Sequence, residues 1–126
     1  MENDTTKIII IGGKGNGTVV LSCLIDMNIN HNYNYEILGF VNDNYDEIKS
    51  IDGYPVLGNF EDFINICIEY KAVYINAITS TKTIKSIEEK FNNFADFRKY
   101  STTIIHPTAF IAYNVKFSDG VFVGPQ

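Results

Sequence analysis

The feature that most constrains the fold is a run of four isoleucines that leads directly into a glycine-rich segment. The sequence KIIII at residues 7–11 is followed by GGKGNG at residues 12–17. A continuous run of β-branched residues is typical of a strand that is buried on both faces of a parallel sheet. Glycine permits positive φ angles and lets a ligand approach the backbone, so the segment predicts a turn before a helix.

Strands and helices alternate after this segment. Apolar residues at helical spacing run from Val19 to Met27, and EILGFV at residues 36–41 forms a second apolar strand. A strand, a glycine-rich turn, a helix and a second strand together make one βαβ unit of the expected size. The first third of the chain is therefore predicted to begin a parallel sheet.

The middle of the chain continues the alternation. Turn residues in IDGYPVLG flank a short extended piece, and Asn59 is placed to cap a helix that extends to Glu69. The pattern then predicts a third strand at residues 72–78, a helix around residues 84–94 and a short strand in STTII. We therefore expect an α/β fold, a small Rossmann-like parallel sheet with flanking helices, over residues 1–103.

The end of the chain follows a different period. Apolar residues recur at six-residue spacing, namely Ile105, Ile111, Phe117 and Val123. Neither a helix nor an ordinary strand requires that period, but a left-handed parallel β-helix does, with one repeat for each flat face of a triangular coil. Residues 104–126 are therefore predicted to form the first coil of such a solenoid, truncated after about one turn. The alternative is a chance alternation of apolar residues in a terminal strand pair.

The composition is that of an ordinary globular protein, with 45% apolar and 20% charged residues. The net charge of −5 argues against a nucleic-acid partner, and no apolar run approaches a membrane span. The acidic N-terminus does not resemble a signal peptide, so we expect a cytoplasmic protein. Cys23 and Cys67 lie in separate apolar helical patterns, without metal-ligand spacing, which predicts two buried thiols and no bound metal.

Candidate ligand-binding residues lie where the carboxyl ends of the parallel strands meet. A glycine-rich loop before a helix N-terminus suits a phosphate, although its glycine spacing differs from that of GxGxxG and of a P-loop. Residues that follow the second strand are placed to reach a ribose or base, and small residues after the third strand leave room for a ligand. The candidates are Gly13, Lys14, Gly15, Asn16, Gly17, Asn42, Asp43, Ala77, Ile78 and Thr79. The alternatives are a turn that only connects two elements and a solvated Asn-Asp turn.

The segments IIIIGGKGNG, GFVNDN, GYPVLG and IHPTAFIA, in this order, resemble the bacterial PglD/NeuD-type sugar-nucleotide acyltransferases over essentially the whole chain. The resemblance implies an N-terminal domain that binds the nucleotide part of a UDP- or dTDP-linked amino sugar. It also implies a hexapeptide-repeat domain that forms a homotrimer and binds acetyl-CoA. By position, residues 13–17 would contact the diphosphate, Asn42 and Asp43 the nucleoside, and residues 77–79 the crevice wall.

Two polar residues need separate interpretation. The family usually has histidine where this chain has Asn16, and that histidine helps to position the sugar nucleotide. His106 precedes a proline, and in the family this pair marks the first corner of the solenoid, so we expect a structural or surface histidine. The resemblance places the catalytic histidine on the solenoid beyond this chain, so we expect no catalytic residue here.

The predicted function is the nucleotide-sugar-binding part of an acetyl-CoA-dependent N-acetyltransferase. The chain alone is expected to bind its ligand without catalysis and to be monomeric or weakly associated. Two alternatives remain: an NAD(P)-binding oxidoreductase domain and a nucleotide-sensing module that performs no chemistry.

Overall fold

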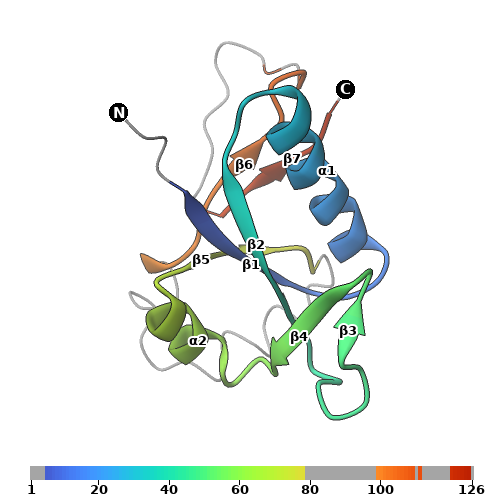
Figure 1. Ribbon diagram of the computed structural model, residues 1–126, viewed down its shortest axis with the longest axis vertical. Helices are drawn as coiled ribbons and strands as arrows, with labels where there is room; N and C mark the ends of the chain where they lie inside the picture. The colour runs from blue at the N-terminus through green and yellow to red at the C-terminus, as the bar shows by residue number, and fades with distance from the viewer. Residues whose placement is uncertain (1–4, 79–98, 110, 112–119, 126) are drawn as a thin grey trace.

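A computed structural model describes residues 5–78, 99–109, 111 and 120–125 (Figure 1). Its main part is a five-stranded sheet in the order β3-β4-β2-β1-β5, and a second, two-stranded sheet pairs β6 with β7. The strands of the larger sheet are β1 (Thr6–Ile11), β2 (Tyr35–Val41), β3 (Ser50–Ile51), β4 (Tyr54–Gly58) and β5 (Val73–Asn76). All neighbours in this sheet are parallel except β3 and β4, which form an antiparallel edge. The predicted α/β class is therefore confirmed.

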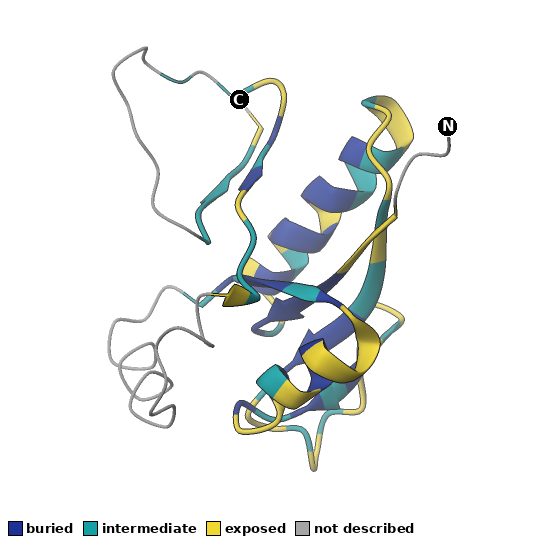
Figure 2. Cartoon of the chain, turned by 90° about the vertical axis from the view of Figure 1, so that its left-hand side faces the viewer, coloured by how far each residue is buried: buried dark blue, intermediate teal, exposed yellow. Residues whose placement is uncertain are grey.

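The isoleucine run is explained by burial on both faces of the sheet. Ile8 and Ile10 pack in one apolar cluster with residues of α1 (Asn16–Asn30), whereas Ile9 and Ile11 pack in a second cluster with residues of α2 (Phe63–Tyr70). Successive side chains of a strand point to opposite faces, so a helix on each face must cover them. Figure 2 shows buried residues along the length of α1, which lies beside the sheet. None of the helices described is long and apolar enough to cross a membrane.

The second helix begins later than the sequence predicts. Asn59 is not its cap: the Asn59 side-chain oxygen accepts a hydrogen bond from the Glu61 N–H at 3.0 Å, and α2 starts after Asp62. Asn59 therefore forms a separate turn before the helix, because short polar side chains bond readily to the backbone two residues on. The helix ends at Tyr70, followed by Lys71 in a left-handed conformation with φ 55°. The predicted helix at 84–94 lies outside the described residues.

A bulge in β2 shifts the register of its pairing with β1 at the centre of the sheet. The pairing of β1 with β2 shifts between Ile8, which faces Ile37, and Ile9, which faces Gly39. Gly39 has a φ of 150°, and a Cβ at this position would lie 2.3 Å from the carbonyl oxygen of Pro55. The missing side chain therefore lets β4 approach β2 where a larger residue would overlap its backbone.

The six-residue period has a direct counterpart in the structure. β6 (Ile104–Ile105) and β7 (Phe122–Val123) are parallel, and Ile105 pairs with Val123, which is 123 − 105 = 18 residues later. This offset equals three six-residue steps, which is the length expected for one coil of the predicted solenoid. Residues 110 and 112–119 of the intervening stretch lie outside the described residues. Ile104 is 1% exposed and belongs to the same apolar cluster as Ile8.

Both cysteines are buried free thiols, as predicted from their apolar surroundings. Burial raises the pKa of Cys67 to about 12, so its thiol carries much less reactive thiolate than an exposed thiol does. We expect an aromatic disulfide reagent to label the native chain at pH 8 at least about 100-fold more slowly than the chain unfolded in denaturant. Rapid labelling of both thiols without denaturant would contradict this burial.

Candidate functional site

A cavity of about 240 Å³ lies where the carboxyl ends of β1 and β5 meet the N-terminus of α1. It is lined by Gly12, Gly13, Lys14, Asn16, Gly17, Ala77 and Ile78. Six of the ten residues predicted from the sequence therefore come together around one cavity. In doubly wound folds, ligands bind at this edge of the sheet.

The electrostatics of this cavity favour an anion. Gly15 has a φ of 93° and precedes the first turn of α1, where backbone N–H groups have no partner within the helix. The first turn contains no acidic residue, and the side chain of Lys14 is exposed beside it. The positive end of the helix therefore meets a cavity that Lys14 also lines.

Asn42 holds the glycine segment in place. Its side-chain amide donates a hydrogen bond to the carbonyl oxygen of Gly12 at 3.0 Å, and its side-chain oxygen accepts one from the N–H of Asn44 at 2.8 Å. Asn42 thus joins the end of β2 to the loop after β1. Neither Asn42 nor the exposed Asp43 lines the cavity, so their predicted contact with a nucleoside stays a prediction. Thr79 lies outside the described residues.

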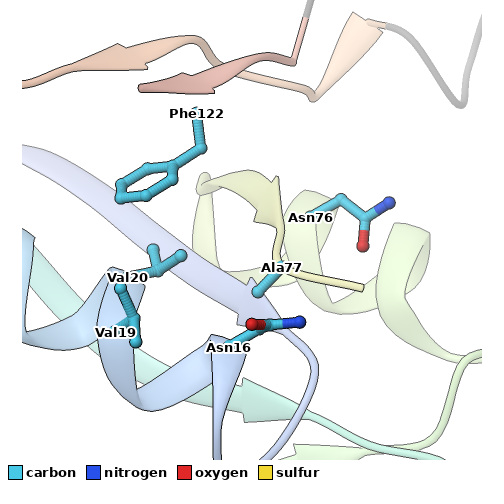
Figure 3. Close-up of a pocket in the computed structure, with 6 residues that line it drawn as sticks. All are labelled: Asn16, Val19, Val20, Asn76, Ala77 and Phe122. Carbon is cyan, nitrogen blue, oxygen red and sulfur yellow. The ribbon is translucent and has the colours of Figure 1, made fainter. Parts of the chain in front are cut away.

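A second cavity of about 220 Å³ adjoins the first, because Asn16 and Ala77 line both. Its other lining residues are Val19, Val20, Asn76 and Phe122 (Figure 3). Figure 3 shows the Phe122 ring extending from β7 toward Val20 of α1. The sequence did not predict this wall, since only the folded chain brings β7 to the helix.

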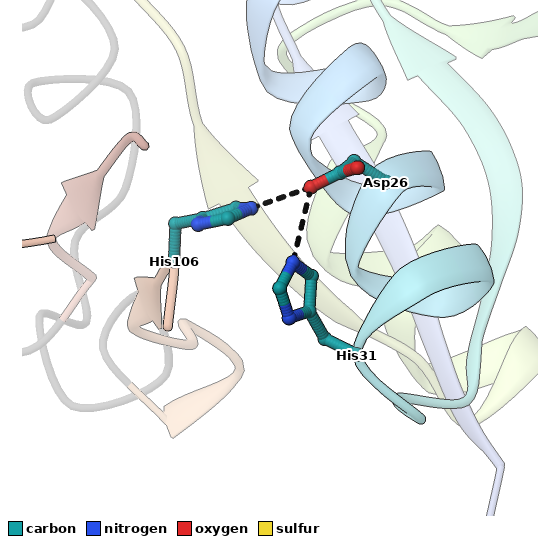
Figure 4. A group of neighbouring side chains, drawn as sticks. All are labelled: Asp26, His31 and His106. Atoms are coloured by element: carbon teal, nitrogen blue, oxygen red, sulfur yellow. Dashed lines mark hydrogen bonds and ion pairs between the residues drawn. The ribbon is translucent and has the colours of Figure 1, made fainter. Parts of the chain in front are cut away.

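A polar cluster lies nearer the other end of α1. His106 is 2% exposed, and its Nε2 lies 2.6 Å from Oδ2 of Asp26 (Figure 4). Because the N–H of Thr108 donates to Nδ1 at 3.1 Å, the neutral ring carries its proton on Nε2 and donates it to Asp26. The hydrogen bond from His106 lowers the pKa of the Asp26 carboxyl, and one from Asn30 lowers it further. His106 is therefore buried and hydrogen-bonded rather than at the surface.

Comparison with known proteins gives a family match and a set of similar folds. The family described as the PglD N-terminal domain matches residues 7–91. No curated protein sequence matches the chain. The acetyltransferase domain of PglB from Neisseria gonorrhoeae, solved with acetyl coenzyme A, is 23% identical with a TM-score of 0.70, over 97% of this chain and 54% of that one.

A second similar structure is PerB from Caulobacter crescentus, solved with CoA and GDP-perosamine. It is 20% identical, with a TM-score of 0.68, over 94% of this chain and 51% of that chain. The chain thus spans about half the length of both solved structures. At these identities, the likeness shows a shared fold.

Proposed function

We propose that this chain, which belongs to the family of PglD N-terminal domains, binds the nucleotide part of a nucleoside-diphosphate amino sugar. The proposal rests chiefly on the cavity of about 240 Å³, where the glycine segment, Lys14 and the N-terminus of α1 face the end of β5. Backbone N–H groups at a helix N-terminus and a lysine together suit a diphosphate. Residues 13–17 would contact this diphosphate and Asp43 the nucleoside.

The whole protein would then be an acetyl-CoA-dependent N-acetyltransferase. We propose that it is located in the cytoplasm and forms a homotrimer. PerB was solved with CoA and GDP-perosamine and PglB with acetyl coenzyme A, which supports this reaction class. A histidine general base would take a proton from the amine of the sugar, which attacks the thioester carbonyl of acetyl-CoA. The C–S bond then breaks, and CoA leaves as the thiol with the proton that the histidine returns. We assign none of these steps to the present chain, whose part is to bind and orient the nucleotide sugar. For the nucleobase of the nucleotide sugar, we propose uracil or thymine.

Charge reversal at Lys14 tests the position of the diphosphate. We expect Lys14→Glu to weaken nucleoside-diphosphate binding by roughly tenfold or more, because it removes a charge-assisted hydrogen bond and adds repulsion. Lys7→Glu is the matched control, since it makes the same charge change at the opposite end of β1. Equal affinities of the two variants would place the diphosphate elsewhere.

Calorimetric titration of the chain with UDP, dTDP, GDP, NADH and acetyl-CoA, all at one salt concentration, tests the function itself. Saturable binding of a nucleoside diphosphate, without heat from acetyl-CoA, supports the proposal, and the preferred base identifies the substrate class. Binding of NADH alone would instead support an oxidoreductase domain. Nucleotide binding in a full-length protein that lacks acetyl transfer would support a sensing module.

A further inference from the structure

Both histidines of the chain come to the same carboxylate oxygen. Nε2 of His106 lies 2.6 Å and Nε2 of His31 lies 3.5 Å from Oδ2 of Asp26. One potential ligand atom from each of the three residues lies within 4.8 Å of the other two. Figure 4 shows the two rings approaching the carboxylate from different sides. The glycine-lined cavity shares no residue with this cluster.

Three separate places in the chain supply these groups. Asp26 lies on α1, and His31 follows the last turn of that helix. His106 follows β6 and is 80 residues from Asp26 in the sequence. The cluster therefore exists only when the segment after β6 is packed against α1. An ion held there would join these two parts of the chain.

Outer hydrogen bonds already orient two of the three groups. The side-chain amide of Asn30 donates to Oδ1 of Asp26 at 2.6 Å, which leaves Oδ2 facing the histidines. The hydroxyl of Thr108 lies 2.8 Å from Nδ1 of His106. When Nε2 binds a metal, the ring proton resides on Nδ1. The Thr108 N–H, which donates to Nδ1 at 3.1 Å in the metal-free chain, must then turn away, and the Thr108 hydroxyl oxygen is placed to accept the ring proton. Such outer partners are a regular feature of metal-binding histidines and carboxylates.

We propose that Asp26, His31 and His106 bind a divalent metal ion such as Zn²⁺. The fourth coordination position of the ion would be open to water. Imidazole nitrogen and carboxylate oxygen are normal zinc ligands, and three protein ligands with one open position form a known class of site. Ligand atoms of a tetrahedral zinc ion lie about 3.3 Å apart, so the ion would separate the His106–Asp26 pair slightly and replace the proton on Nε2.

Solvent can reach the proposed site. The side chains of Asp26 and His31 are 41% and 30% exposed, whereas that of His106 is 2% exposed. Asp26 also lines a cavity of about 300 Å³ that extends between α1 and Pro125. Two accessible ligands and one buried ligand therefore leave a route for the ion and for a bound water.

This inference differs from the expectation of no metal drawn from the sequence. No metal motif was visible because the ligands are 5 and 75 residues apart along the chain, at positions 26, 31 and 106. Motif spacing identifies sites formed by one local segment, whereas this site depends on tertiary packing.

Metal titration of the chain, free of any histidine tag and stripped with a chelator that is then removed, tests the proposal. We expect one Zn²⁺ ion per chain to raise the melting temperature, and Co²⁺ to give the visible absorption of a four-coordinate site. Asp26→Asn and His31→Ala should each weaken binding about 100-fold or more, whereas Thr108→Val, which keeps all three ligands, should weaken it about tenfold.

His31→Ala is the decisive variant. It retains the hydrogen bond between Asp26 and His106, so the metal-free variant should fold with a melting temperature close to that of the original chain. Glu69→Gln, on the exposed side of α2, controls for nonspecific binding to acidic residues and should leave affinity unchanged. Equal Zn²⁺ affinity of the original chain and His31→Ala, or no saturable binding, overturns the site. The nucleotide titration is independent of this result.

Discussion

Replacing Gly39 with alanine is expected to lower the free energy of unfolding by about 3 kcal/mol or more. The φ of 150° is strained for any residue with a side chain, and the new Cβ would lie 2.3 Å from the carbonyl oxygen of Pro55. That oxygen belongs to the backbone of β4 and cannot rotate away. The overlap can be relieved only if β4 moves away from β2, at the centre of the sheet.

Urea unfolding measures this loss, and Gly53→Ala is the matched control. Gly53 also has a positive φ, of 85°, but a Cβ there would meet nothing within 4 Å. The control therefore reports backbone strain alone, about 1 kcal/mol, and the difference between the variants reports the overlap with β4. Equal losses in the two variants would mean that β2 and β4 tolerate a side chain between them.

Phe40→Ala is expected to cost about 3–5 kcal/mol of stability. Phe40 is completely buried in the cluster beneath α1, and its Cε2 lies 3.1 Å from where a Cβ on Gly17 would stand. The ring thus supports the first turn of α1 from below. Its loss should leave a cavity under the glycine segment and weaken nucleotide binding as well as the fold.

A graded series makes this prediction measurable even if the alanine variant is too unstable to study. Phe40→Leu keeps an apolar group of similar size and should cost about 1.5 kcal/mol or less in urea unfolding. Ile68→Ala, at a side chain that is 54% exposed, should change stability by less than about 0.5 kcal/mol. If Phe40→Ala were as mild as Ile68→Ala, the ring would contribute little to the core.

The sequence predicts the fold well where one local pattern determines one element. The four isoleucines of β1 predict a strand that is buried on both faces, and all four are buried. The six-residue period predicts an 18-residue repeat, and Ile105 pairs with Val123, 18 residues later. The glycine segment also lines the cavity, since five of the seven residues around it come from residues 12–17.

The sequence is less informative where two distant segments decide the outcome. The predicted contact of Asn42 with a nucleoside stays a prediction, whereas the sequence did not indicate that its side chain donates to the carbonyl oxygen of Gly12, 30 residues away. Asp26 was not singled out, because an acid on an amphipathic helix usually faces solvent and nothing nearby predicts His106 as its partner. The start of α2 was misplaced because Asn59 can cap a helix or form a turn, and local sequence does not distinguish the two.

The burial of Ile104 has a consequence for how the chain divides into folding units. The change of period near residue 104 suggests two units, yet Ile104 and Phe122 pack in the same apolar cluster as Phe40. A chain ended at residue 103 would lose those two side chains from its interior and leave Asp26 without His106. Part of the interior beside the sheet is thus completed by residues after 103, so we expect a chain ended there to be less stable than the present one.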